Sequence, residues 1–205
     1  AHDEDSLNRM IFKASDKLSV LASGGDVMLD NSLNADQLEN MIDLLMAKYP
    51  VVFADLSQAP QALQKVVLAR AHQINIVSSH GLVSLRQGRS LIQEINDIRG
   101  GDGTNIELLI NMHGLAAAQE VPKKDIETAM DLKVSAFVPF EPKVFQGNES
   151  ESRKITDDKD GANILKQTIL PIVQKVIKGG SDVPEVSPQQ GKGFLDGLIG
   201  KLSSK

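Results

Sequence analysis

Short apolar runs alternate with longer amphipathic segments along most of the chain. Runs of about five residues with few charges are typical of buried strands, and apolar residues repeated every three or four positions are typical of helices. The predicted strands are Leu18–Ala22, Val51–Asp55, Ile74–Val77, Ile106–Met112 and Ser135–Pro139. The main predicted helices are 35–48, 61–71, 82–99, 121–130 and 162–178. This alternation predicts an α/β fold with a mostly parallel, doubly wound sheet and helices on both faces.

The stretch from Tyr49 to Ser79 shows this layering most clearly. Its first predicted strand, Val51–Asp55, ends on a carboxylate, and a helix then leads to the second strand at Ile74–Val77. A strand–helix–strand unit places its two strands as parallel neighbours in one sheet. Ligands of such sheets bind beyond the carboxyl ends of the strands, where Asp55 and Ser78 are expected to lie.

The chain after the last predicted strand carries weaker patterns. Residues Pro142–Phe145 are predicted to form one helical turn, and the polar stretch Gln146–Gly161 is predicted to be a loop of low order. In the final helix, Pro171 falls within the apolar stripe. Proline removes a backbone donor and clashes with the preceding turn, so a kink is expected there.

The composition excludes several classes of protein. Hydrophobic residues make up 41% of the 205 residues and aromatic residues 3%, so the core is expected to be aliphatic. A formal net charge of −5 argues against general nucleic-acid binding, which needs a basic face. The chain has no cysteine, which excludes disulfides and thiolate metal sites and fits a cytoplasmic protein. No apolar run approaches the roughly 18 residues of a membrane span, and the acidic start AHDEDSLNRM is unlike a signal peptide.

The sequence changes character near its end. Residues 1–178 are predicted to form the α/β domain, 179–193 a flexible linker rich in Gly, Pro, Ser and Gln, and 194–205 an amphipathic helix. The apolar face of this helix, with its flanking lysine, consists of Phe194, Leu195, Leu198, Ile199, Leu202 and Lys201. Such a helix is expected to bind an anionic membrane surface or a partner protein. Packing back on the domain, or fraying, is the alternative, because two glycines weaken the helix.

The four histidines form no recognisable metal motif. His2, His72, His80 and His113 show no paired spacing on one helix, so a metal site is not predicted. His80 and His113 each follow a predicted strand and could reach a pocket at the strand ends. An unrelated doubly wound enzyme that uses either histidine is therefore one alternative, which loss of a small-molecule activity on His113→Ala would support.

Asp55 and Asn111 are the strongest candidates for binding chemistry. A carboxylate that closes a buried strand can order a metal-bound water at a nucleotide site, although a loop acid or helix cap explains Asp55 equally well. An amide near the end of a buried strand offers both a donor and an acceptor to a base, or bonds to neighbouring backbone. The glycine pair Gly24-Gly25 is predicted to be a turn, because no GKS or GKT sequence follows it.

Four segments follow one another in an order that resembles a known family. They are YPVVFADLSQAP, NIVSSHGLVSLRQGRSLIQEI, LLINMHG and FVPFEPKVF. Together they resemble the second half of the MinD/ParA-type P-loop ATPases, in particular the pilus-assembly branch called TadZ or CpaE. The resemblance covers roughly Leu18 to Lys178.

The resemblance implies roles for several residues. Asp55 would be the strand-end acid that contacts magnesium through water near the phosphates. Asn111 would read the adenine, and Pro139 with the backbone of Phe140 and Glu141 would form the loop beside the base. The C-terminal segment is similar to the membrane-targeting helix of MinD-like proteins.

Two departures from the family limit what the resemblance implies. The Gly-rich phosphate loop and its lysine are absent from the chain, and Ser57 stands where the branch usually has proline. Without the loop, ATP hydrolysis by this chain is not expected, and ATP with Mg²⁺ would belong to a longer parent protein. The chain begins at Ala1 rather than Met, which favours a fragment or a processed form.

The resemblance therefore implies a nucleotide-linked localisation factor. It would be a cytoplasmic protein, expected to be a homodimer, that positions a type IV or tight-adherence pilus or secretion machine at a cell pole or the inner membrane. The alternative from another class is a degenerate localisation scaffold that binds no nucleotide.

Overall fold

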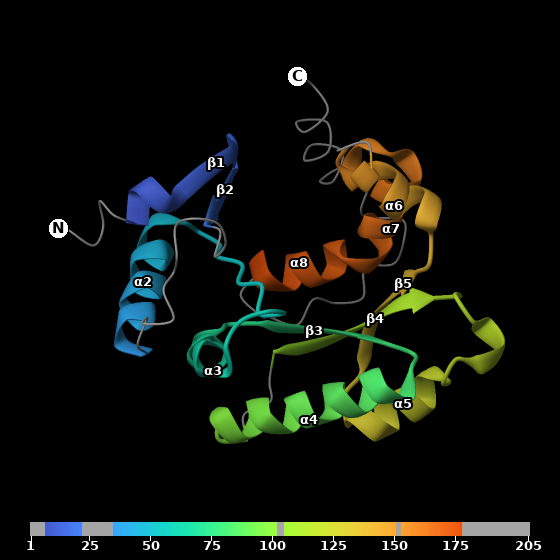
Figure 1. Ribbon diagram of the computed structural model, residues 1–205. Coiled ribbons are helices and arrows are strands. Elements are labelled where there is room, and N and C mark those ends of the chain that lie inside the picture. Colours follow the sequence, from blue (N-terminus) through green and yellow to red (C-terminus); the bar gives the residue numbers. More distant parts are fainter. Residues whose placement is uncertain (1–6, 22–34, 102–104, 151–152, 178–205) are drawn as a thin grey trace. The chain divides into compact units, whose positions relative to one another are not determined.

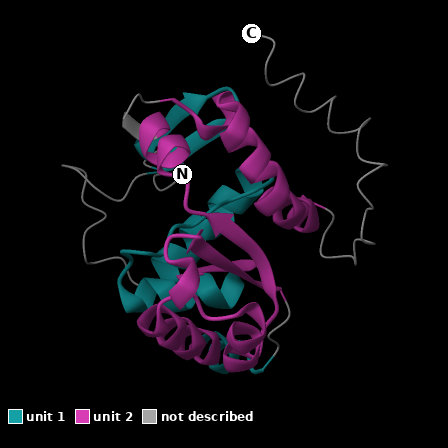
Figure 2. Ribbon diagram, turned by 90° about the vertical axis from the view of Figure 1, so that its right-hand side faces the viewer, with its two compact units in different colours: residues 1–71, 95–102 teal, residues 72–94, 103–205 magenta. Residues whose placement is uncertain are grey.

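The computed structural model describes residues 7–21, 35–101, 105–150 and 153–177 (Figure 1). The chain divides into two compact units, shown in Figure 2. Unit 1 comprises residues 1–71 and 95–102, and unit 2 comprises 72–94 and 103–205. The glycine pair at 24–25, the predicted linker at 179–193 and the predicted helix at 194–205 lie outside the described residues.

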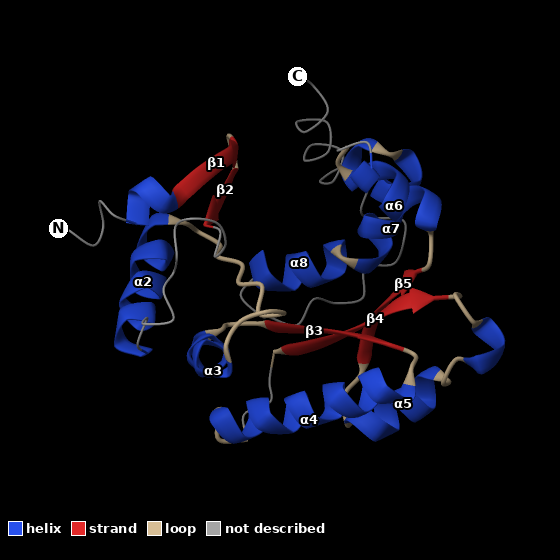
Figure 3. Ribbon diagram, viewed as in Figure 1, coloured by secondary structure: helices blue, strands red, loops and turns tan. Residues whose placement is uncertain are grey.

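Unit 2 is built on a three-stranded parallel sheet (Figure 3). Its strands are β3 (Ile74–Ser79), β4 (Ile106–His113) and β5 (Val134–Pro139), hydrogen-bonded in that order. All residues from Ile106 to Ile110 are buried, as expected for a central strand with both faces covered. The three strands confirm the parallel α/β arrangement predicted for this part of the chain.

Helices cover both faces of this sheet (Figure 1). On one side lie α4 (Leu82–Ile98), whose last turn belongs to unit 1, and α5 (Lys123–Met130). On the other side, Ile172 of α8 (Leu170–Ile177) forms a core cluster with Leu109 and Ala136, and Ile169 packs against this cluster. The sheet with its two helical layers therefore has the doubly wound form that the alternating pattern predicts.

A buried carboxylate on β4 links this strand to α8 and β5 by hydrogen bonds. Glu107 is buried, and one of its carboxylate oxygens accepts a hydrogen bond from Lys175 at 2.8 Å. The other oxygen accepts a hydrogen bond from the hydroxyl of Ser135 on β5. Both carboxylate oxygens thus have partners, which removes most of the cost of burying the charge.

The C-terminal part of unit 2 is more ordered than its sequence pattern predicts. The single turn predicted at 142–145 is a helix of nine residues, α6 (Pro142–Ser150), and η2 (Ile155–Asp157) leads into α7 (Lys159–Thr168). The prediction of a loop through 146–161 is therefore wrong. Two polar side chains explain the difference: buried Asn148 donates to the carbonyl of Val144, and Asp158 caps α7 by accepting from Gly161.

The predicted kink at Pro171 is confirmed as a break in the helix. The segment divides into α7, which ends at Thr168, and α8, which begins at Leu170. Pro171 is the second residue of α8, where its missing N–H removes no bond that the helix needs. The break at Ile169 therefore lies two residues before Pro171, so the proline falls in the first turn of a new helix and not inside a continuous one.

Besides a helical segment at residues 7–10 and the last turn of α4, the described part of unit 1 contains a β-hairpin and the helices α2 (Ala35–Lys48) and α3 (Gln61–Arg70). The hairpin pairs β1 (Ile11–Ser15) with β2 (Leu18–Leu21) antiparallel. The strand predicted at 18–22 exists, but it belongs to this hairpin and not to the parallel sheet. The two-residue turn at Asp16-Lys17 explains this, since so short a connection can join only antiparallel neighbours.

The prediction of a buried strand at Val51–Asp55 is wrong. These residues form no strand, and the exposed fractions of Val51, Val52 and Phe53 are 43%, 41% and 77%. An apolar run becomes a strand only when a neighbouring strand pairs with it, and none of the described strands does so. The following loop is held instead by Gln64, which donates to the carbonyls of Leu56 at 3.2 Å and Ala59 at 2.8 Å.

Within the described ranges, none of the helices combines the length and the apolar character that crossing a membrane requires.

Candidate functional site

The carboxyl ends of the three parallel strands bring several polar side chains together in unit 2. In the sheet register, Ser79 lies opposite Asn111, and His113 lies opposite Pro139. The backbone N–H of Phe140 also donates to the carbonyl of His113 at 2.8 Å. The segments that follow β3, β4 and β5 therefore share one edge of the sheet, where open α/β sheets bind ligands.

His80, His113 and Glu120 form the tightest group of titratable side chains at this edge, referred to below as the histidine cluster. His80 Nε2 lies 3.0 Å from His113 Nδ1 and 3.4 Å from Glu120 Oε2. His113 Nδ1 lies 2.9 Å from the same Glu120 oxygen. The three atoms therefore converge on one point, as metal ligands do.

Surrounding groups hold each member of the histidine cluster in place. His80 Nδ1 lies 3.2 Å from the carbonyl of Val121, and Glu120 Oε1 accepts from the backbone N–H of Gly114 at 2.6 Å. The ring of Phe137 lies 5.7 Å from that of His80 and 4.9 Å from that of His113. His80 and Glu120 are each 11% exposed, whereas His113 is 48% exposed. The histidine cluster is thus held by hydrogen bonds and by the ring of Phe137, and it is open to solvent at His113.

The chain turns sharply at the end of β4 to present His113. Met112 has φ +60° and Gly114 has φ +91°, a conformation that non-glycine residues rarely adopt. The side-chain oxygen of Asn111 accepts from the N–H of Met112 at 2.8 Å and so supports the turn. Asn111 therefore has the local backbone bond that was one of its two predicted roles.

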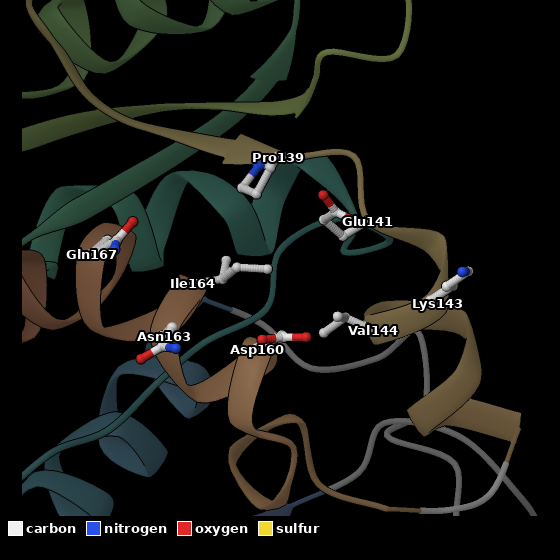
Figure 4. Close-up of a pocket in the computed structure, with 8 residues that line it drawn as sticks. All are labelled: Pro139, Glu141, Lys143, Val144, Asp160, Asn163, Ile164 and Gln167. Carbon is white, nitrogen blue, oxygen red and sulfur yellow. The ribbon is translucent and has the colours of Figure 1, made fainter.

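An open cavity of about 330 Å³ lies beside the end of β5 (Figure 4). Its lining residues are Pro139, Glu141, Lys143, Val144, Asp160, Asn163, Ile164 and Gln167. Figure 4 shows Glu141 and Lys143 on the β5–α6 side of the cavity, and Asp160, Asn163 and Gln167 on the α7 side. Two carboxylates and one lysine give the lining a formal charge of about −1, so the cavity suits a neutral, hydrogen-bonding group better than phosphates.

The structure places the sequence-predicted site residues in different surroundings. Pro139 and Glu141 line the cavity, whereas Phe140 and Asn111 are not among its lining residues. Asp55 belongs to unit 1, where it is an exposed loop residue whose side chain accepts from the N–H of Ser57 at 3.0 Å. This bond, with a second from the Ser57 side chain, lowers the pKa of the Asp55 carboxyl from its ordinary value.

Sequence reasoning missed two features of this edge. The histidine pair was recognisable in principle, because His80 and His113 follow adjacent parallel strands whose ends must meet. Glu120 was not, because it lies in a connection without periodicity between β4 and α5. The polar cavity wall was also recognisable in principle, because Asp160, Asn163 and Gln167 share one face of α7 at helical spacing.

Comparisons with known proteins identify the fold. The structure is similar to that of a ParA family ATPase from Chlorobium tepidum TLS, with a TM-score of 0.67 and 15% sequence identity over 82% of this chain and 69% of the other. The chain has the fold of the ParA and MinD proteins. MinD cell division protein from Aquifex aeolicus matches with a TM-score of 0.65 and 14% identity, over 87% of this chain and 71% of MinD. No protein-family model matches the chain, and no curated protein matches its sequence.

Proposed function

We propose that this protein is a MinD/ParA-like localisation factor that uses nucleotide binding as a switch. The observation that carries the proposal is the structural likeness to a ParA family ATPase and to MinD across more than four fifths of the chain. The ordered segments that resemble the pilus-assembly branch support a role in positioning a type IV or tight-adherence pilus or secretion machine. Homodimerisation and contact with an anionic membrane surface belong to the same proposal.

In this proposal the base and ribose of ATP bind at the edge of the unit 2 sheet. The resemblance places Pro139, Phe140 and Glu141 beside the base, and two of these three residues line the open cavity. Glu141 and Asp160 could accept hydrogen bonds from ribose hydroxyls, and Asn163 and Gln167 offer amides to a base. The phosphates and Mg²⁺ would need a Gly-rich loop and lysine encoded outside these 205 residues, with Asp55 as the acid near the metal.

The test is nucleotide binding by the protein expressed from its complete reading frame. A fluorescent ATP analogue is titrated with and without Mg²⁺, and saturable, Mg²⁺-dependent binding is expected. Asn111→Ala should weaken binding about two- to tenfold, the effect of one lost hydrogen bond of about 0.5–1.5 kcal/mol. Asn75→Ala is the matched control, because Asn75 is an exposed amide of the neighbouring strand β3. Equal losses in both variants would contradict the role of Asn111.

A localisation scaffold that binds no nucleotide is the second candidate function. The absence of any GKS or GKT sequence in the 205 residues favours it, and so does the exposed loop position of Asp55. The coding DNA immediately upstream of the Ala1 codon separates the two candidates. An in-frame Gly-rich loop ending in Gly-Lys-Ser or Gly-Lys-Thr supports the ATPase relative, and an upstream region without it supports the scaffold.

A further inference from the structure

We propose that His80, His113 and Glu120 form a binding site for a divalent transition-metal ion, with Zn²⁺ as the best-fitting ion. The proposal rests on the geometry of the histidine cluster and does not depend on nucleotide binding. Two imidazoles and one carboxylate are a ligand set that Zn²⁺ accepts with three protein atoms and one open position. His80 directly follows β3, His113 is the last residue of β4, and Glu120 lies in the connection between β4 and α5.

The spacing of the three ligand atoms is already close to that of a tetrahedral site. A Zn²⁺ ion about 2.0–2.1 Å from each ligand holds neighbouring ligand atoms about 3.3–3.4 Å apart. The three separations in the histidine cluster are 2.9, 3.0 and 3.4 Å. An ion at their centre therefore requires the side chains to move apart by a few tenths of an ångström, which rotation of the half-exposed His113 ring can supply.

The hydrogen bonds fix which ring nitrogens face the centre. The Val121 carbonyl can only accept, so Nδ1 of neutral His80 carries the proton and Nε2 presents a lone pair to the cluster. Glu120 Oε2 is also an acceptor, so the N–H of His113 Nδ1 occupies the space between the two acceptors. Metal binding replaces this single proton, which moves to Nε2 of the same ring as the imidazole changes tautomer.

The outer partners of the cluster are those that orient metal ligands in proteins. A ligating histidine usually donates its second ring N–H to a carbonyl or carboxylate, as His80 does to Val121. Glu120 is fixed in the same way, because Gly114 occupies one carboxylate oxygen and leaves the other facing the histidines. A chance meeting of three surface side chains would not explain why two of them are 11% exposed and hydrogen-bonded on their far sides.

The fourth position of the site faces solvent. His113 is the most exposed of the three ligands at 48%, so a water molecule can complete the coordination there. An ion in this position would join the ends of β3 and β4 to the loop that carries Glu120. We therefore expect Zn²⁺ to stabilise the edge of the sheet as well as to hold a water molecule.

The experiment uses the 205-residue chain after treatment with a chelator. Titration calorimetry with Zn²⁺ should show one saturable site, and Zn²⁺ should raise the melting temperature. Addition of Co²⁺ should produce the intense visible absorption of a tetrahedral ion, which Zn²⁺ then displaces. Far-UV circular dichroism of each variant establishes that it remains folded.

Two ligand variants and two control variants define the site. Glu120→Gln keeps the bond to Gly114 through its carbonyl oxygen but places an amide where the metal ligand was, and His113→Asn removes the most exposed ligand. Each should weaken Zn²⁺ binding by at least about tenfold and abolish the Co²⁺ absorption. His72→Asn and His2→Asn replace the other two histidines of the chain and should leave both measurements unchanged.

Three results would overturn the proposal. They are the absence of saturable Zn²⁺ binding, equal affinity in wild type and in folded Glu120→Gln, and a loss of affinity in His72→Asn or His2→Asn as large as that in His113→Asn. Each of these results is independent of whether ATP binds, so the metal site and the proposed nucleotide function can fail separately.

Discussion

Two glycines of unit 2 differ in the space that surrounds them. Gly161 is buried in the first turn of α7, and a Cβ there would meet the backbone oxygen of Ile155 and lie 2.8 Å from its Cγ2 atom. A Cβ at Gly147 in α6 would meet no described atom within 4 Å beyond the neighbouring residues and the backbone of its own helix. The space around each glycine, and not its helical setting, therefore decides what a methyl group would do.

We expect Gly161→Ala to destabilise the protein and Gly147→Ala to stabilise it. The first change forces backbone apart and should lower the free energy of unfolding by about 1–3 kcal/mol. The second adds helix propensity without a clash and should raise it by about 0.5–1 kcal/mol. Urea denaturation followed by circular dichroism measures both, and equal effects of the two changes would contradict the packing around Gly161.

Glu127 makes the stability of the protein depend on acid pH. Its carboxylate accepts from the backbone N–H of Val134 at 2.9 Å, and this bond, helped by Lys133 and Lys123, lowers the pKa of the carboxyl. A carboxyl with a lower pKa in the folded state binds fewer protons when folded than when unfolded. Its stabilising effect is therefore complete above the ordinary glutamate pKa of about 4.3 and is lost as the pH falls through the lower folded value.

The variant Glu127→Gln tests this dependence. At pH 7 it should be less stable than wild type, and the difference should shrink as the pH is lowered below about 4. Urea denaturation between pH 3 and pH 7 measures the difference. Because the backbone bond is the larger cause, most of the difference should survive salt that screens the lysines; its disappearance in salt would contradict this assignment.

At the scale of elements, the apolar pattern predicted most helices and the strands of the parallel sheet. It succeeded for β4, which is buried from Ile106 to Ile110, because continuous apolar runs are typical of strands covered on both faces. In β3 and β5 buried residues alternate with more exposed ones, and their short apolar runs were enough to indicate strands. It failed at Val51–Asp55 because periodicity identifies an apolar run and says nothing about a pairing partner. It also failed between residues 146 and 161, where capping by Asp158 and the buried amide of Asn148 give order to a polar stretch.

The candidate site was predictable only in part for the same reason. Parallel strands carry their carboxyl ends to one edge, so a pattern of strands is enough to place His80, His113 and Pro139 near one another. The backbone turn at Met112 and the course of the loop to Glu120 follow from local hydrogen bonds that no periodicity reveals. Strand-end residues can thus be grouped from the sequence, whereas the position of Glu120, the third member of the histidine cluster, is known only from the structure.

At the scale of the whole molecule, the proposed function includes a role for the C-terminal segment, residues 194–205. This segment lies outside the described residues, and its apolar face is defined by sequence alone. In the proposed function it attaches the protein to an anionic membrane surface, since apolar residues enter the interface while lysines contact anionic headgroups.

Deletion of Gly193–Lys205 tests this attachment. We expect the shortened protein to keep its circular dichroism spectrum and melting temperature, and to lose binding to anionic liposomes in a flotation assay. The substitution Leu198→Glu should have the same effect, because it places a charge on the apolar face. Liposomes of neutral lipid are the control. Unchanged flotation of the shortened protein with anionic liposomes would contradict membrane attachment through this segment.

The packing around Met130 has a consequence for oxidative damage. Met130 is 2% exposed, and its methyl carbon packs against α4 at Gly88, so solvent and peroxide have little access to its sulfur in the folded state. Met46 and Met112, by contrast, are 43% and 48% exposed and are open to peroxide in the folded state. Sulfoxide at Met46 or Met112 therefore reports exposure to oxidant alone. We expect sulfoxide at Met130 to form only after local or global opening exposes its sulfur, so it would record that the contact between α5 and α4 had opened.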